Sequence, residues 1–217
     1  MKLQAVVFDL NGTLVDDIQF HFEAWKALGE RHGFAMTPAI FQACNGLKNE
    51  DIVPRLLGRE VAPALVDALG REKEERYRAL YRPRLAPVRG APELFARLRA
   101  RGLKLAVASS APRENREMVI DGLGWSATFD VVVANEGLRG KPAPDIFLAA
   151  AERLAVPPEA CLAFEDAENG VVAARAAGMT VVGVTTNVAA EALERAGAAS
   201  TIADFSALPD ELDVLLS

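Results

Sequence analysis

Five short apolar runs recur along the chain and constrain its fold more than any other feature. They span residues 4–9, 104–108, 129–134, 161–165 and 180–184, and they are rich in valine. Nearly continuous hydrophobic runs of this length are typical of strands that helices cover on both faces. Helix-like segments lie between them at residues 92–101, 113–123, 144–155 and 169–177. The alternation predicts an α/β fold with a doubly wound parallel sheet.

The interval from residue 17 to residue 87 differs from the rest because it contains no convincing strand. Phe20, Ala24 and Leu28 recur at helical spacing, as do Ile52 and Leu56. We therefore expect an all-helical cap domain at residues 17–87, inserted into a Rossmann-like core domain formed by residues 1–16 and 88–217. The two connections should lie near residues 15–18 and 84–90.

Charge and cysteine content exclude several classes of protein. The formal net charge of −6 argues against a nucleic-acid partner, because binding to a phosphate backbone requires a basic face. Cys44 and Cys161 lie far apart and outside any CxxC pair, so neither a disulfide framework nor a zinc site is predicted. No apolar run approaches the roughly 20 residues of a membrane span, and the start of the chain does not resemble a signal peptide. We expect a cytoplasmic protein, a monomer or weak homodimer, with no membrane partner.

Polar side chains follow four of the runs, at the point where each predicted strand ends. In a doubly wound sheet, ligands bind beyond these carboxyl ends, so the side chains should converge on one crevice. Each group alone has a plainer explanation, such as a capped turn, a helix N-cap, a surface lysine or an acidic helix start. Their conjunction favours a functional site. The residues are Asp9, Asn11 and Thr13, with Gly12 allowing the backbone to turn between them, then Ser109, Ser110, Arg113 and Asn115, then Lys141, and finally Glu165 and Asp166.

The chemistry of these groups indicates a small phosphate and a divalent cation. Asp9, Asp166 and Glu165 offer hard oxygen ligands, which suit Mg²⁺ with a substrate phosphate completing its shell. The hydroxyls and helix N-terminal amides after the second run can hold phosphate oxygens. Lys141, in a loop stiffened by prolines, can neutralise phosphate charge.

Four motifs in this arrangement resemble the haloacid dehalogenase superfamily. They are residues 9–13, 107–110, 140–145 and 164–170, and the resemblance covers essentially the whole chain. It is strongest to the branch with a helical cap after the first motif, which contains β-phosphoglucomutases and sugar-phosphate phosphatases. The run from His21 to Leu28 is similar to the mutases, as is the placement of Lys73 four residues before Tyr77.

This resemblance implies a role for each motif residue. Asp9 would attack phosphorus to form an aspartyl phosphate. Mg²⁺ would be held by Asp9, Asp166 and the main-chain carbonyl of Asn11, with Glu165 in or behind the metal shell. Ser109 and Lys141 would hold the phosphoryl oxygens, and Lys141 would also restrain Asp9.

Further residues are candidates for substrate binding, although each one alone could equally be an ordinary surface residue. A polar, hydroxylated leaving group would be gripped by the cap, and the core would add hydroxyl and amide groups. The cap candidates are His21, Gly46, Lys48, Asn49 and Lys73, and the core candidates are Thr13, Ser110, Arg113 and Asn115.

Asn11 stands where the resembled family carries an aspartate that serves as general acid and base. An amide cannot exchange protons in this way, so help worth about 10²- to 10⁴-fold should be missing. Since the rest of the site is intact, we interpret Asn11 as a substitution introduced to trap a ligand or intermediate. A naturally acid-free variant is the alternative. Asn11→Asp is expected to raise turnover by at least about 100-fold.

Three functions remain open at this point. Thr13 and Asp17 stand where the mutases tend to carry valine and threonine, and residues 46–50 lack the mutase arginine unless Lys48 replaces it. These differences favour a phosphatase acting on small sugar or polyol phosphates. The alternatives are a hexose phosphate mutase and a non-catalytic protein that binds a phosphorylated metabolite.

Overall fold

A six-stranded parallel sheet forms the centre of the protein, as the alternating pattern predicts. The computed structural model describes residues 2–44 and 47–209. The strand order is β3-β2-β1-β4-β5-β6, and every pair is parallel. The sixth strand was missed from sequence because it has only three residues, two of them half-exposed. The strands are β1 Ala5–Phe8, β2 Lys104–Ser109, β3 Val131–Ala134, β4 Cys161–Glu165, β5 Thr180–Val184 and β6 Ser200–Ile202.

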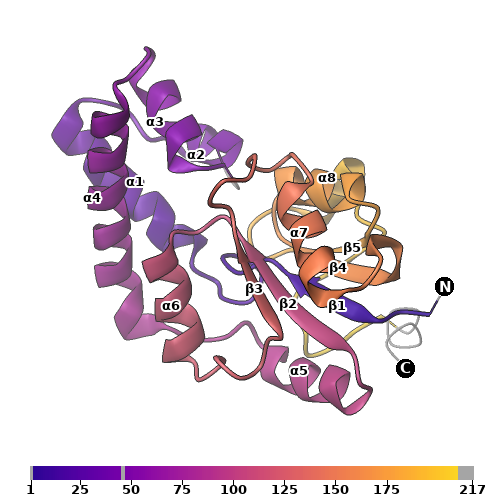
Figure 1. Cartoon of the computed structure of the whole chain (residues 1–217). Coiled ribbons are helices and arrows are strands. Elements are labelled where there is room, and N and C mark those ends of the chain that lie inside the picture. The colour runs from indigo at the N-terminus through magenta and orange to yellow at the C-terminus, as the bar shows by residue number, and fades with distance from the viewer. Residues whose placement is uncertain (1, 45–46, 210–217) are drawn as a thin grey trace.

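Helices cover both faces of the sheet, which is why its central strands are largely apolar. Successive strand residues point to opposite faces. In β1, Val6 and Phe8 pack in one core with α5 (Ala91–Ala100) and α6 (Arg113–Gly122). Ala5 and Val7 pack in a second core with α7 (Asp145–Leu154), α8 (Glu168–Ala176) and α9 (Ala190–Ala196). Figure 1 shows these two helical layers, with α5 and α6 across the sheet from α7 and α8. Two 3₁₀ turns, Arg82–Arg84 and Pro158–Ala160, complete the regular structure.

Four of the helices between β1 and β2 form a helical body beyond the strand ends. They are α1 (Ile18–His32), α2 (Pro38–Cys44), α3 (Asn49–Leu57) and α4 (Pro63–Tyr81). Trp25, Leu28 and Leu69 belong to a third apolar cluster, distinct from the two that flank the sheet. The chain leaves and re-enters the sheet domain side by side, because Val15 bridges Pro87 and the amide of Val88 donates to the carbonyl of Leu14 at 2.8 Å. Figure 1 shows these four helices to one side of the sheet.

Both cysteines are buried free thiols. In the described ranges, no helix combines the length and apolar character needed to cross a lipid bilayer.

Candidate active site

The carboxyl ends of three neighbouring strands bring the predicted polar residues together. Phe8 of β1 is in register with Val107 of β2 and Phe164 of β4. Asp9, the next residue, therefore lies level with Glu165 and close to Ser109. The amide of Asp9 donates to the carbonyl of Phe164 at 3.0 Å, which extends the strand pairing up to the site.

Three buried carboxylates form a compact cluster at this edge. Asp9, Glu165 and Asp166 each offer an oxygen, and these oxygens lie within 4.8 Å of one another. Lys141 joins the cluster from the loop after β3: its Nζ lies 2.6 Å from Oδ1 of Asp9 and also donates to Oε1 of Glu165. Three carboxylates thus face one ammonium group in a buried space, which leaves an excess of negative charge.

This excess of negative charge, together with burial, shifts the pKa values of the cluster. Burial raises the pKa of Asp9 to about 7, although Lys141 acts in the opposite direction. Burial, and then the charges of Glu165 and Asp9, raise the pKa of Asp166 well above its ordinary value. For Lys141, burial alone would lower the pKa, but the two carboxylates outweigh it and raise that pKa. A cation shared by the carboxylates would relieve this strain.

The residues present fit a hard divalent cation. Oδ1 of Asp166 accepts a hydrogen bond from Thr13 at 2.9 Å, but the buried Oδ2 of Asp166 has no partner among the described residues. Gly12, with φ of +84°, faces this carboxylate so closely that a Cβ would overlap it. Oxygen ligands of this kind suit Mg²⁺. The cluster could therefore hold such an ion.

A cavity of about 630 Å³ lies between the strand ends and helices α1, α3 and α4. Most of the predicted site residues line it, from both bodies of the protein. Gly46 lies outside the described residues. Thr13 and Asn115 do not line the cavity. The lining includes Asp9, Asn11, His21, Lys48, Asn49, Lys73, Ser109, Ser110, Arg113, Lys141, Glu165 and Asp166.

Thr13 and Asn115 act on neighbouring side chains instead, because both are fully buried. Thr13 lies behind Asp166, as described above. Asn115, near the start of α6, donates to Glu74 at 2.7 Å and accepts from Arg78 at 2.8 Å, so it joins helix α4 to the sheet domain. The guanidinium of Arg113 pairs with Glu117 on the surface.

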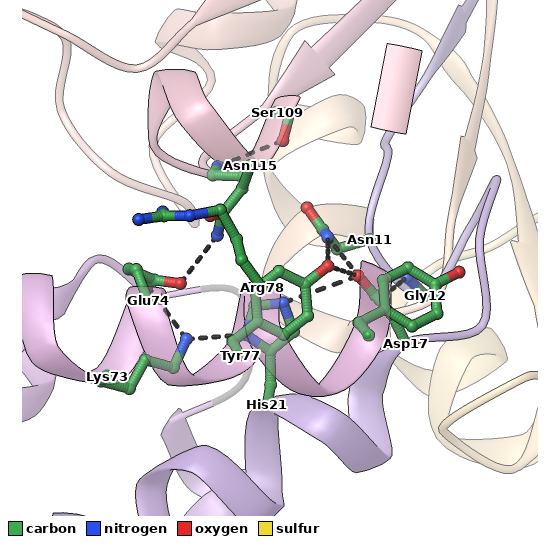
Figure 2. Close-up of polar contacts among 12 residues, drawn as sticks. Asn11, Gly12, Asp17, His21, Lys73, Glu74, Tyr77, Arg78, Ser109 and Asn115 are labelled. Atoms are coloured by element: carbon green, nitrogen blue, oxygen red, sulfur yellow. Dashed lines mark hydrogen bonds and ion pairs between the residues drawn. The ribbon is translucent and has the colours of Figure 1, made fainter. Parts of the chain in front are cut away.

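Charged residues of α4 form a buried network on the cavity wall. Nζ of Lys73 lies 2.6 Å from Nδ1 of His21 and 3.0 Å from Glu74. Asn49 also donates to Glu74, at 3.0 Å. Burial opposes the ionisation of Glu74, but Lys73 and His21 lower its pKa to about 2. Figure 2 shows this network reaching from Lys73 toward Asn115.

Sequence reasoning missed two residues of this site. Glu74 lies in a run of charged residues that has the pattern of a solvated helix face, yet it is buried. Asp17 was noted only as a difference at the hinge, but its side chain is fully buried and contacts Asn11 and Tyr77. Asp17 stands directly before helix α1, where an aspartate is also common as an ordinary N-cap. The sequence therefore could not distinguish a capping residue from a residue of the site.

Comparison with known proteins places this geometry among hydrolases. A family model described as haloacid dehalogenase-like hydrolase matches residues 3–178. A phosphorylated carbohydrates phosphatase of Thermotoga maritima is 32% identical, over 82% of this chain and 82% of that protein. A beta-phosphoglucomutase of Bacillus subtilis is 34% identical, over 84% and 83%. The crystal structure of a HAD hydrolase, family IA, variant 3, from Entamoeba histolytica has a TM-score of 0.88 at 29% identity and covers 99% of both chains.

Proposed function

The chain belongs to the haloacid dehalogenase-like hydrolase family, and we propose that it is a Mg²⁺-dependent phosphatase of small sugar or polyol phosphates. The buried cluster of Asp9, Lys141, Glu165 and Asp166 carries this proposal. It combines a nucleophile with charge-neutralising groups, and positioning with neutralisation accounts for most of the catalysis of phosphoryl transfer. The similarity to a carbohydrate phosphatase and a sugar-phosphate mutase supports the substrate class.

The proposed reaction has two steps, and residues at the strand ends act in them. Asp9 attacks phosphorus and forms an aspartyl phosphate while the substrate oxygen leaves as an alkoxide that takes a proton from solvent, and water then hydrolyses this intermediate. Lys141 holds the Asp9 carboxylate through its 2.6 Å bond and faces the incoming phosphoryl group. Oγ of Ser109 accepts the amide of Ala111 at 3.1 Å, so its own proton is left to donate to a phosphoryl oxygen.

Asp9, Asp166 and the main-chain carbonyl of Asn11 would hold the Mg²⁺, with Glu165 in or behind its shell. When bound, the ion neutralises charge on the phosphoryl group and helps to orient it. The unpartnered oxygen of Asp166 supports this assignment. Residues 17–87 would form the cap that selects the leaving group, over a core of residues 1–16 and 88–217.

Lys48 favours a phosphatase over a mutase. A mutase must grip a second phosphate, and Lys48 was the cap residue that could do so. Its Nζ instead donates to the main-chain carbonyls of Asn135 at 3.1 Å and Leu138 at 2.5 Å. These bonds tie the cap to the loop after β3 and occupy the ammonium group. The hexose phosphate mutase and the non-catalytic binding protein remain the alternative functions.

The deciding experiment incubates the protein with β-glucose 1-phosphate, a trace of the bisphosphate, and either Mg²⁺ or EDTA. Release of free phosphate that requires Mg²⁺ supports the phosphatase, and formation of glucose 6-phosphate supports the mutase. A panel of sugar and polyol phosphates then ranks the substrates, with Asp9→Asn as the matched control that lacks the nucleophile. Magnesium-dependent binding of substrate without turnover of any panel member, even by variants with an acid at position 11, would support the binding protein.

A further inference from the structure

A buried carboxylate and an amide face each other in the turn after β1. Nδ2 of Asn11 donates to Oδ2 of Asp17 and also lies 3.2 Å from the hydroxyl of Tyr77. The Tyr77 hydroxyl donates to the same Asp17 oxygen, and the amide of Gly12 donates to Oδ1 at 3.1 Å. Both oxygens of Asp17 therefore act as acceptors, for three converging donors. Figure 2 shows Asp17 at the meeting point of these groups.

This arrangement decides how the Asn11 amide is turned. Since the Asp17 carboxylate only accepts, the NH₂ group of Asn11 must face it, and the amide oxygen points away. Burial, and then the charge of Asp17, raise the pKa of Tyr77 well above its ordinary value, so that Tyr77 stays a donor. Figure 2 shows the Asn11 oxygen directed away from Asp17 and Tyr77. Among the described residues that oxygen has no protein partner, and Asn11 lines the cavity with Asp9.

We propose that Asp17 is a positioning residue, which holds the Asn11 amide with its oxygen turned toward the cavity to accept a hydrogen bond from the attacking water. The inference rests on the proposed phosphatase function. Water forms a bond to phosphorus, the bond between phosphorus and the Asp9 oxygen breaks, and both protons of the water leave with the phosphate, which is released as dihydrogen phosphate. Asn11 takes up no proton in this step and acts by orienting the water.

The same contacts make an amide, and not an acid, the matching residue at position 11. An aspartate there would set a second carboxylate against the buried Asp17. The ammonium group of Lys73 is already engaged, because it contacts His21 and Glu74, while Nε2 of His21 lies 3.6 Å from Oδ2 of Asp17. An amide that belongs to this chain is therefore favoured over one introduced to trap a ligand. The gain in turnover from Asn11→Asp alone should therefore be smaller than the restoration of a general acid at position 11 suggests.

The test compares the native protein with Asn11→Asp, Asp17→Asn and the exchange variant Asn11→Asp/Asp17→Asn, which keeps one carboxylate and one amide. Asp16→Asn removes the same charge from the neighbouring, exposed residue and is the matched control. Thermal unfolding is measured without substrate or metal, and kcat and KM are measured with p-nitrophenyl phosphate and Mg²⁺. The melting data do not depend on activity, so a failure of the proposed phosphatase can be told apart from a failure of the pair.

We expect Asn11→Asp to melt roughly 6 °C or more below the native protein, because two buried carboxylates then share one site. The exchange variant should recover at least half of that loss and should have the highest kcat, since its acid at position 11 has an amide partner. Asp17→Asn should lower kcat about 10- to 100-fold with KM changed less than about threefold, because the Asn11 oxygen is no longer held. Native melting of Asn11→Asp, or native kcat of Asp17→Asn, would overturn the inference.

Discussion

Replacing Gly12 with alanine should remove the response of the protein to magnesium. An added Cβ would lie 2.5 Å from Cγ of Asp166, so the Asp166 carboxylate or the turn after β1 must shift. The backbone at Gly12 also has φ of +84°, and this left-handed conformation costs about 1–2 kcal/mol for a residue with a side chain. Gly33→Ala is the matched control, because Gly33 has φ of +78° but open space where its Cβ would lie.

The two variants should differ in one measurement. A ligand at about 100 times its Kd stabilises a native protein by about 2.7 kcal/mol. At about 2–4 °C per kcal/mol for a protein of this size, Mg²⁺ should raise the native melting temperature by roughly 5–10 °C in a fluorescence melt. Gly33→Ala should melt lower but keep this rise, while Gly12→Ala should lose most of it. An equal Mg²⁺ response of the two variants would mean that Asp166 does not take part in holding the ion.

Two further changes test the rest of the site. Lys141→Met should lower turnover by at least about 100-fold in a phosphate-release assay, because it removes the ammonium group beside Asp9. Lys104→Met is the control: it removes a lysine that donates to the carbonyl of Leu154, and it should keep native turnover. The folded pKa of Glu74, about 2, lies below the ordinary value of 4.5, so its ionisation stabilises the fold above pH 4.5 and this stability is lost as the pH falls toward 2. Glu74→Gln should therefore unfold more easily at pH 7, by on the order of 3 kcal/mol, and vary less across that window in circular dichroism melts; an unchanged pH profile would contradict the buried pairing of Glu74.

The sheet could be predicted because local pattern and tertiary environment agree there. Residues 161–165 are apolar up to Phe164, and helices cover both faces of the strand they form. The strand at residues 200–202 could not be recognised, since three residues, two of them only partly buried, carry too little pattern. The cluster at the strand ends could be predicted for a similar reason: parallel strands end at one edge, so Asp9, Lys141 and Asp166 could be grouped before their distances were known.

The sequence by itself determined which chemical groups meet, because the alternation of strands and helices and the polarity at the strand ends are local properties that the fold preserves. Only the tertiary structure decided how the buried polar groups around the cavity are used. Asp17, Glu74 and Asn115 come from segments far apart in the chain, and their sequence neighbourhoods are those of ordinary surface residues. Burial against one another changes what they do, since a carboxylate without water must be satisfied by the donors that the fold brings to it.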